Sequence, residues 1–254
     1  WPAGVPVSAR RFMSDAQQLP ATLPSGGPAI NLCSDRYAFA VGLAAAMLRG
    51  HASLLPPDAR PDTLARLHES GDDCYALTDD ASLATPGFQR VLYDLPACGE
   101  AAGAAAVSEL AFEAGRHAVS LLTSGSTGAP QAHAKRWGTL VGDVAAAVPR
   151  LASLLGRSSL EGLTLVATVP VQHSYGLESS VLLALLGGAA FDSGRPFFPA
   201  DIAQALASVP RPRALVTTPF HLKTLLLWGV DLPPVDFILS ATPPLSQQLA
   251  AQGE

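Results

Sequence analysis

Short apolar runs alternate with longer apolar stretches along the chain, and this alternation predicts its secondary structure. Apolar runs bounded by Gly or Pro predict strands, and the longer stretches between them predict helices. Strands and helices that alternate at this spacing are typical of a parallel α/β sheet. The predicted strands are 29–33, 52–55, 74–78, 117–123, 163–169, 189–191, 214–218 and 237–240, and the predicted helices are 14–19, 36–48, 61–70, 137–155, 182–186, 202–208 and 222–228.

The order of these elements predicts the division of the chain into domains. Residues 1–28 form a polar lead-in punctuated by prolines. Residues 29–160 form a first α/β lobe, and residues 161–254 form a second. The expected fold class is therefore α/β, with two stacked lobes and largely parallel sheets.

Composition excludes several classes of protein. Hydrophobic residues make up 48% of the chain and charged residues 15%, which excludes a disordered chain. The net charge of −5 excludes a general nucleic-acid binder. The longest apolar run, Val181 to Phe191, is shorter than the roughly 20 residues that span a bilayer. Cys33, Cys74 and Cys98 lack metal-ligand spacing and no secretory signal is visible, so we expect a cytoplasmic protein with free thiols and no metal held by cysteine.

A Gly/Ser/Thr-rich segment follows the predicted strand 117–123 and has the composition of an anion-binding loop. Gly125 and Gly128 allow the backbone to turn tightly and to approach a ligand. Backbone N–H groups and hydroxyls gathered after a buried strand suit phosphate oxygens. The alternative is an ordinary solvated turn. The spacing matches neither GxxxxGK[ST] nor GxGxxG, and the hydroxyl-bearing residues are Ser124, Ser126 and Thr127.

Thr123–Pro130 resembles the phosphate-binding signature of the adenylate-forming superfamily, which includes acyl-CoA synthetases, peptide-synthetase adenylation domains and luciferases. The resemblance implies an enzyme that uses ATP to convert a carboxylate to an acyl adenylate and pyrophosphate, and then passes the acyl group to a thiol. Gln131 stands where the family usually has lysine. Lys135 or Arg136, a turn further on, could supply the missing charge. The resemblance covers roughly residues 29–254.

Two further segments resemble the parts of this family that surround the acyl group. Val169–Leu177 resembles Pro-x-x-His-x-x-Gly-Leu, which implies that His173 is a catalytic residue that holds the carboxylate or gates the thiol path. The same segment places Tyr175 and Gly176 in the substrate pocket, and Thr217–Phe220 resembles the pocket wall. Taken alone, His173 would be a hydrogen-bonded histidine after a strand, and core packing explains Phe220 equally well.

Ser240–Ser246 resembles the Ser-Gly-Gly-Ala-Pro-Leu-Ser segment whose backbone lies against adenine. Ala241 and Thr242 replace the two glycines. The nucleotide site that the resemblance implies consists of Thr123, Ser124, Gly125, Ser126, Thr127, Gly128, Gln131, Lys135, Ser240, Ala241, Thr242 and Pro243.

The remaining functional elements of the family follow the adenine segment, and they are not found before Glu254. They are a glutamate that holds Mg²⁺, an aspartate for the ribose and a C-terminal domain with the catalytic lysine. We therefore expect the N-terminal part of an enzyme that uses ATP and Mg²⁺, with CoA or a carrier-protein thiol as acceptor. The 254 residues alone are expected to be inactive in adenylation and to bind an anion weakly at Ser124–Gly128.

Three functional hypotheses follow. The first is an acyl- or aryl-CoA synthetase, whose substrate is a small carboxylic acid, aliphatic or aromatic. The second is a non-catalytic descendant that binds a nucleotide or an acyl group, which Gln131, Ala241 and Thr242 favour. The third is an unrelated phosphotransferase, which lacks candidate metal-binding carboxylates.

Overall fold

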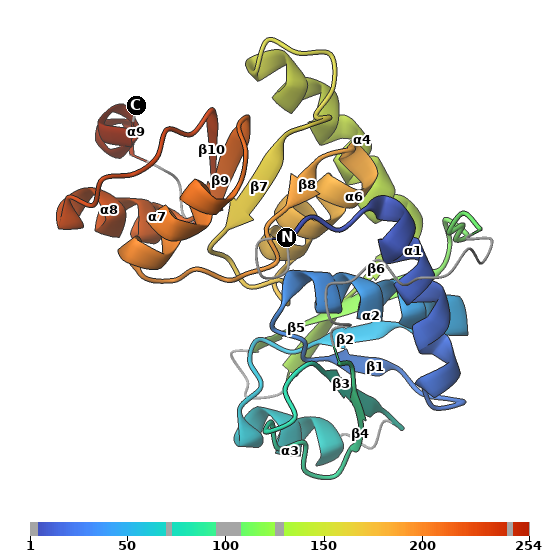
Figure 1. Cartoon of the computed structure of the whole chain (residues 1–254). Helices are drawn as coiled ribbons and strands as arrows, with labels where there is room; N and C mark the ends of the chain where they lie inside the picture. The colour runs from blue at the N-terminus through green and yellow to red at the C-terminus, as the bar shows by residue number, and fades with distance from the viewer. Residues whose placement is uncertain (1–4, 70–72, 95–107, 125–129, 243–245, 254) are drawn as a thin grey trace. The chain divides into compact units, whose positions relative to one another are not determined.

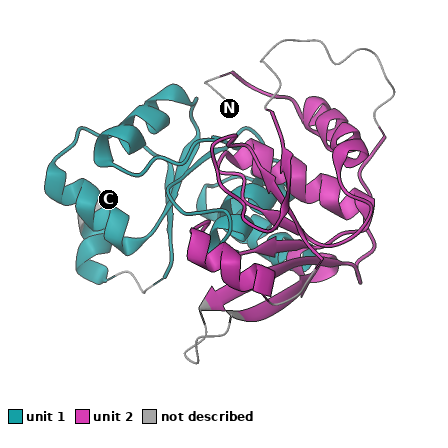
Figure 2. Cartoon of the chain, turned by 90° about the horizontal axis from the view of Figure 1, so that it is seen from below, with its two compact units in different colours: residues 1, 3, 141–254 teal, residues 2, 4–140 magenta. Residues whose placement is uncertain are grey.

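The chain divides into two compact units along its sequence. The structure, a computed structural model, describes residues 5–69, 73–94, 108–124, 130–242 and 246–253. Unit 2 comes first in the sequence, extends to Leu140 and is drawn in magenta (Figure 2). Unit 1 follows it, begins at Val141 and is drawn in teal. The division falls inside helix α4 (Trp137–Leu154), before the boundary between residues 160 and 161 that the sequence predicted.

Unit 2 contains a six-stranded sheet with the order β4-β3-β1-β2-β5-β6 (Figure 1). All neighbouring pairs are parallel except β5 and β6, which form an antiparallel hairpin. The strands are β1 (Ala29–Asn31), β2 (Ser53–Leu55), β3 (Tyr75–Thr78), β4 (Gln89–Leu92), β5 (His117–Ser124) and β6 (Pro130–Arg136).

Helices cover both faces of this sheet. Helix α2 (Arg36–Arg49) is buried over most of its length and packs so closely that a Cβ on Gly42 would lie 2.5 Å from a methyl carbon of Leu77 on β3. Asp35 caps the start of α2, and Gly50 ends it in the left-handed conformation. Helix α3 (Pro61–Glu69) buries its leucines in a cluster with Ile30 and Leu122. The helical elements before β1 are α1 (Ala9–Gln18) and the short 3₁₀ helix η2 (Leu19–Thr22).

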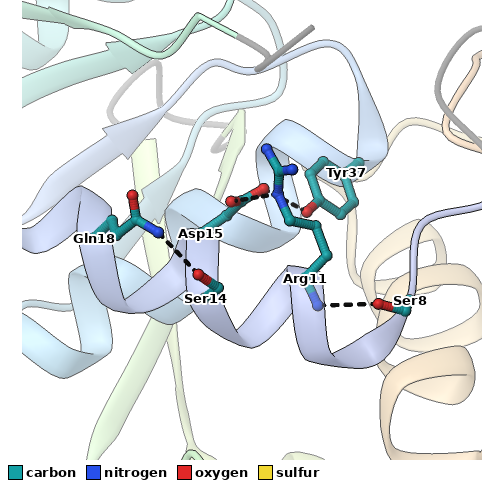
Figure 3. Close-up of polar contacts among 6 residues, drawn as sticks. All are labelled: Ser8, Arg11, Ser14, Asp15, Gln18 and Tyr37. Atoms are coloured by element: carbon teal, nitrogen blue, oxygen red, sulfur yellow. Dashed lines mark hydrogen bonds and ion pairs between the residues drawn. The ribbon is translucent and has the colours of Figure 1, made fainter. Parts of the chain in front are cut away.

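A buried carboxylate joins α1 to α2 (Figure 3). Asp15 of α1 accepts a hydrogen bond from the hydroxyl of Tyr37 on α2 at 2.7 Å, and it pairs with Arg11 at 2.8 Å. Tyr37 is itself buried, and burial raises the pKa of its hydroxyl. The residues between Gly4 and Ala29 are therefore part of unit 2, because α1 is fastened to the helix that covers its sheet.

Unit 1 contains a four-stranded parallel sheet with the order β10-β9-β7-β8. Helices α7 and α8 bury Ile202, Leu206 and Leu225 against Val166 and Leu215 of the sheet. The strands are β7 (Thr164–Ala167), β8 (Ala190–Phe191), β9 (Arg213–Thr217) and β10 (Phe237–Ser240), and the helices after α4 are α5 (Ser174–Gly176), the π-helix η3 (Leu177–Leu182), α6 (Leu183–Gly187), α7 (Pro199–Ser208), α8 (Pro219–Trp228) and α9 (Gln247–Gly253).

The α/β fold class with largely parallel sheets is confirmed, and the predicted strands and helices occur with shifted ends. Helix α4 continues through Pro149. Pro149 and Ala145, the residue four positions earlier, are both exposed, so water can hydrogen-bond the carbonyl that the proline leaves free. Strands β4 and β6, the short helices η2, α5 and α9, and the π-helix η3 were not predicted. In the part of the chain that the structure describes, no helix has the length and apolar character needed to cross a membrane.

Candidate functional site

The β5–β6 hairpin carries the segment that resembles a phosphate-binding loop. Its strands pair from His117 opposite Arg136 to Ser124 opposite Pro130, so the connection between Ser124 and Pro130 is short. Residues Gly125, Ser126, Thr127 and Gly128, on which the predicted phosphate contacts fall, lie outside the described residues.

Two polar side chains flank this connection. Thr123 lies directly opposite Gln131, and both side chains are exposed. The hydroxyl of Thr123 lies 3.5 Å from the carbonyl oxygen of Gln131 and 3.4 Å from Nε2 of His133. Gln131, a predicted phosphate contact, thus lies on β6 opposite Thr123, and His133 is a polar neighbour that was not among the predicted site residues. Alternation along β6 would have indicated it, since residues two apart share a face of a strand.

The expectation that Lys135 or Arg136 replaces the missing charge is wrong in its geometry. The sequence analysis placed these residues one helical turn beyond the loop, but the segment is a strand. Lys135 lies opposite Val119 and Arg136 opposite His117, at the end of the hairpin away from the connection. At roughly 3.3 Å per strand residue, Lys135 lies about 16 Å along β6 from Pro130. Arg136 donates instead to the carbonyl oxygen of Gly115 at 3.1 Å.

The other predicted site segments follow strands of unit 1 at the carboxyl edge of its parallel sheet. The loop with His173 follows β7, the segment with Phe220 follows β9, and Ser240 ends β10. Because β7, β9 and β10 are parallel neighbours, these three segments emerge at the same edge. Open α/β sheets bind their ligands at this edge.

The loop after β7 is closed by a backbone contact that requires glycine. A Cβ on Gly176 would lie 1.9 Å from the carbonyl oxygen of Pro170, so no other residue fits without movement. The Pro-x-x-His-x-x-Gly spacing therefore has a structural reason in this chain. His173 precedes the short helix α5 and is exposed, and its carbonyl oxygen accepts the N–H of Leu177 at 2.9 Å.

The half-buried side chain of Tyr175 contacts two strands at this edge of the sheet. Its hydroxyl lies 3.0 Å from the carbonyl oxygen of Thr217 at the end of β9 and 2.8 Å from that of Leu239 on β10. Burial raises the pKa of Tyr175 well above its ordinary value, so its hydroxyl is protonated and donates at neutral pH. The side chain that the sequence placed in the substrate pocket thus holds the ends of two strands together.

Phe220 belongs to an exposed aromatic group and not to the core. It is 69% exposed, and its ring centroid lies 5.7 Å from that of His221. Phe197, which is 48% exposed, contacts the same imidazole at 5.3 Å. His221 was missed in the sequence analysis. The signal for it was the Thr-Pro-x-His spacing, in which Thr218 caps α8 and accepts the N–H of His221 at 3.3 Å.

One residue of the adenine-like segment has a backbone conformation that favours glycine. Thr242 has a φ of 55°, in the left-handed region that glycine adopts without strain. It stands at a position where the resembled segment has glycine. Ser240 ends β10, Ala241 is half-buried, and Pro243 lies outside the described residues.

A cavity of about 370 Å³ lies beside the π-helix of unit 1. Its walls are mostly apolar and come from α4, η3, α6 and Leu239 of β10, with Asp143, Arg150 and Glu178 as the charged members. Within the described ranges, no group of three His, Cys, Asp or Glu side chains is arranged to hold a metal ion.

Comparison with solved structures identifies the fold. The chain superposes on O-succinylbenzoate coenzyme A synthetase from Bacillus subtilis in complex with AMP with a TM-score of 0.70 at 20% identity, covering 95% of this chain and 49% of that one. ATP-bound MatB from Rhodopseudomonas palustris gives a TM-score of 0.68 at 18% identity, with 96% of this chain and 50% of that one covered. A malonyl-CoA ligase with methylmalonyl-CoA and AMP bound gives 0.66 at 22% identity, with 89% and 50% covered.

The chain therefore has the fold of the matching part of adenylate-forming acyl- and aryl-CoA synthetases, as the resemblance predicted, and it spans about half the length of these three enzymes. No protein-family model and no curated protein matches the sequence.

Proposed function

We propose that this chain is the nucleotide- and carboxylate-binding part of an ATP-dependent acid–thiol ligase of the acyl- or aryl-CoA synthetase type. The observation that carries the proposal is the combination of that ligase fold with the unbroken Thr123–Pro130 signature on the β5–β6 hairpin. Solved structures of the same fold hold ATP with a magnesium ion, and AMP.

In this proposal each predicted segment binds one part of the substrates. The hairpin connection and Gln131 hold the phosphates, and Ser240–Pro243 holds adenine. His173, exposed at the edge, holds the carboxylate. Tyr175 positions this edge through the carbonyls of Thr217 and Leu239.

The proposed chemistry has two balanced steps. A carboxylate oxygen attacks the α-phosphorus of ATP, the bond to the β-phosphate oxygen breaks, and an acyl adenylate and pyrophosphate form. The sulfur of a thiol then attacks the acyl carbonyl, the thiol proton passes to solvent, AMP leaves, and a thioester remains. The acceptor is CoA or a carrier-protein thiol, and the compartment is the cytoplasm. Mg²⁺, when bound, screens the charge of the phosphates.

We expect adenylation by the 254-residue chain alone to be very slow. Gln131 brings no charge to the phosphates, and Lys135 lies at the far end of the hairpin. The loss of one preorganised donor to a transition-state charge costs about 2.7–4 kcal/mol. These same observations favour the second candidate function, a non-catalytic nucleotide- or acyl-binding descendant of the fold.

Calorimetric titration of the chain with ATP and with AMP tests the proposal. We expect both nucleotides to bind, and Gly125→Val to weaken binding at least about tenfold, because hydrogen bonds to a charged ligand contribute about 1.5–3 kcal/mol each. The matched control is Gly26→Val, since a Cβ at Gly26 meets nothing within 4 Å. Failure of both nucleotides to bind the folded chain would exclude the proposed function. If both nucleotides bind to the chain, but a protein that contains the whole fold forms no acyl adenylate, the results would favour the non-catalytic descendant.

A further inference from the structure

His221 occupies the carboxyl edge of the unit 1 sheet, where β7 and β9 end. Its Nδ1 atom lies 3.1 Å from Oγ1 of Thr168, which follows β7, and 3.2 Å from Oγ1 of Thr218, which follows β9. Oγ1 of Thr168 in turn lies 3.0 Å from that of Thr217. Three threonine hydroxyls therefore fix the position and orientation of the imidazole.

These contacts decide which ring nitrogen carries the proton. The oxygen of Thr218 already accepts the backbone N–H of His221, so its own hydrogen is left to donate to Nδ1. Nδ1 then acts as an acceptor, and in the neutral ring the proton lies on Nε2. Burial, and after it the positive charge of Arg195, lower the pKa of His221, so the ring is neutral at pH 7.

The Nε2 atom is buried and has no hydrogen-bond partner among the described residues. Buried polar atoms in folded proteins are nearly always paired, because an unpaired donor loses its hydration without compensation. An oriented, neutral and unpaired N–H at a ligand-binding edge of a sheet is therefore a candidate for contact with a ligand.

Two exposed phenyl rings contact the imidazole of His221. Phe197 and Phe220 contact the imidazole edge-on, with interplanar angles of 83° and 69°. They are 48% and 69% exposed, so both rings are accessible to a ligand. Aromatic side chains favour edge and offset contacts with other planar rings.

We propose that His221 is a specificity-determining residue that donates its Nε2–H to an oxygen substituent, a hydroxyl or a carbonyl, on the ring of an aromatic carboxylic acid held against Phe197 and Phe220. The inference rests on the proposed function, of which it names the substrate class. It specifies an aromatic, oxygen-substituted acid as the substrate, whereas the sequence analysis left both aliphatic and aromatic acids as candidates.

The experiment compares ligands that differ by one hydroxyl on the same folded protein. The full chain, without nucleotide, is titrated with benzoate and with its ortho-, meta- and para-hydroxy isomers while the imidazole signals of His221 are followed by NMR. We expect at least one isomer to bind about two- to tenfold more tightly than benzoate, the effect of one added hydrogen bond. That isomer should also shift the His221 signals.

Variants separate the hydrogen bond from general packing. His221→Phe should make benzoate and the preferred isomer bind equally, and His221→Gln, which retains an N–H donor, should restore part of the difference. The control His68→Phe changes an exposed histidine of unit 2 that also contacts a phenylalanine ring, and it should leave the difference unchanged. Each result is the ratio of the affinities of two ligands for one variant. A loss of stability that weakens both ligands equally therefore leaves this ratio unchanged.

Phe220→Leu should weaken all the aromatic acids, whereas Trp228→Leu, at the other end of α8 and 74% exposed, should weaken none. The inference is overturned if no acid binds, if all four bind equally, or if the difference persists in His221→Phe. Since no nucleotide is present, a failure of ATP to bind would reject the proposed function without changing this comparison.

Discussion

The carbonyl oxygen of Pro170 lies where a side chain on residue 176 would begin, with 1.9 Å between that oxygen and a Cβ built on Gly176. This contact holds the loop that carries His173 against the end of β7. The Pro-x-x-His-x-x-Gly spacing therefore determines where the candidate catalytic residue His173 lies at the edge of the unit 1 sheet.

Gly176→Ala should therefore destabilise unit 1. The added methyl group must displace backbone, and overpacking of this kind costs about 1–3 kcal/mol. Urea unfolding measures the loss. Gly142→Ala is the matched control, because a Cβ at Gly142 meets nothing within 4 Å, and alanine at this helical position should stabilise the protein by roughly 0.5–1 kcal/mol. Equal stability of the two variants would show that the contact with Pro170 is not restrictive.

The left-handed backbone of Thr242 should determine which substitutions at this position destabilise the protein least. At a φ of 55°, a residue with a Cβ is strained by roughly 1–2 kcal/mol and glycine is not. We therefore expect Thr242→Gly to be more stable than Thr242→Ala by about 1 kcal/mol, although elsewhere glycine is usually the worse residue. Thermal unfolding of the two variants checks this. Greater stability of the alanine variant would mean that the residue does not adopt this conformation.

The hydrogen bond between Tyr37 and Asp15 should contribute more to stability than a neutral one. Tyr37→Phe removes a donor from a buried carboxylate, and hydrogen bonds to charged groups contribute about 1.5–3 kcal/mol. Tyr75→Phe, which removes the contact with Nδ1 of His51 at 3.1 Å, should cost about 0.5–1.5 kcal/mol. Chemical denaturation of both variants gives the comparison, and a smaller cost at Tyr37 would contradict the account of how α1 is held on α2.

His221 should titrate below its ordinary pKa of 6.5 in the folded chain. Burial and the charge of Arg195 disfavour the imidazolium, so the unfolded chain takes up the proton first as the pH falls. The stabilising contribution of the neutral ring is present above pH 6.5 and is lost as the pH falls through the lower folded-state value. NMR titration of the His221 ring protons should give a midpoint below 6.5, and His221→Gln should reduce the acid sensitivity of unit 1. A midpoint at or above 6.5 would refute this.

The sequence predicted the fold where the hydrophobic pattern is strong and local. The buried runs of β1, β3, β5, β7 and β9 have no competing interpretation, and the predicted helix 36–48 agrees with α2 to within one residue. Strand β4 was missed because three of its four side chains are exposed, so no apolar run marks this edge strand. Strand β6 begins with a proline and carries mostly polar residues, and it is a strand because it pairs with β5.

The candidate site was predicted where a short motif determines it, and not where it depends on pairing. The positions of Gly176 and Thr242 follow from backbone demands that their sequence segments already indicated. The position of Lys135 depends on the register of the hairpin, which propensity does not reveal. His221 is oriented by Thr168, 53 residues earlier in the sequence, so its role becomes visible only in the folded chain.

The proposed function requires that the β5–β6 hairpin connection binds the phosphates of a nucleotide. The most direct measurement is an amide chemical-shift map of the isotopically labelled chain titrated with ATP. Saturation with ATP should shift the amides of Thr123–Gly128, Gln131 and Ser240–Thr242, and Gly125→Val should abolish these shifts. If saturating ATP leaves these amides unmoved while the rest of the spectrum shows an intact fold, the hairpin connection is an ordinary turn and the account is wrong.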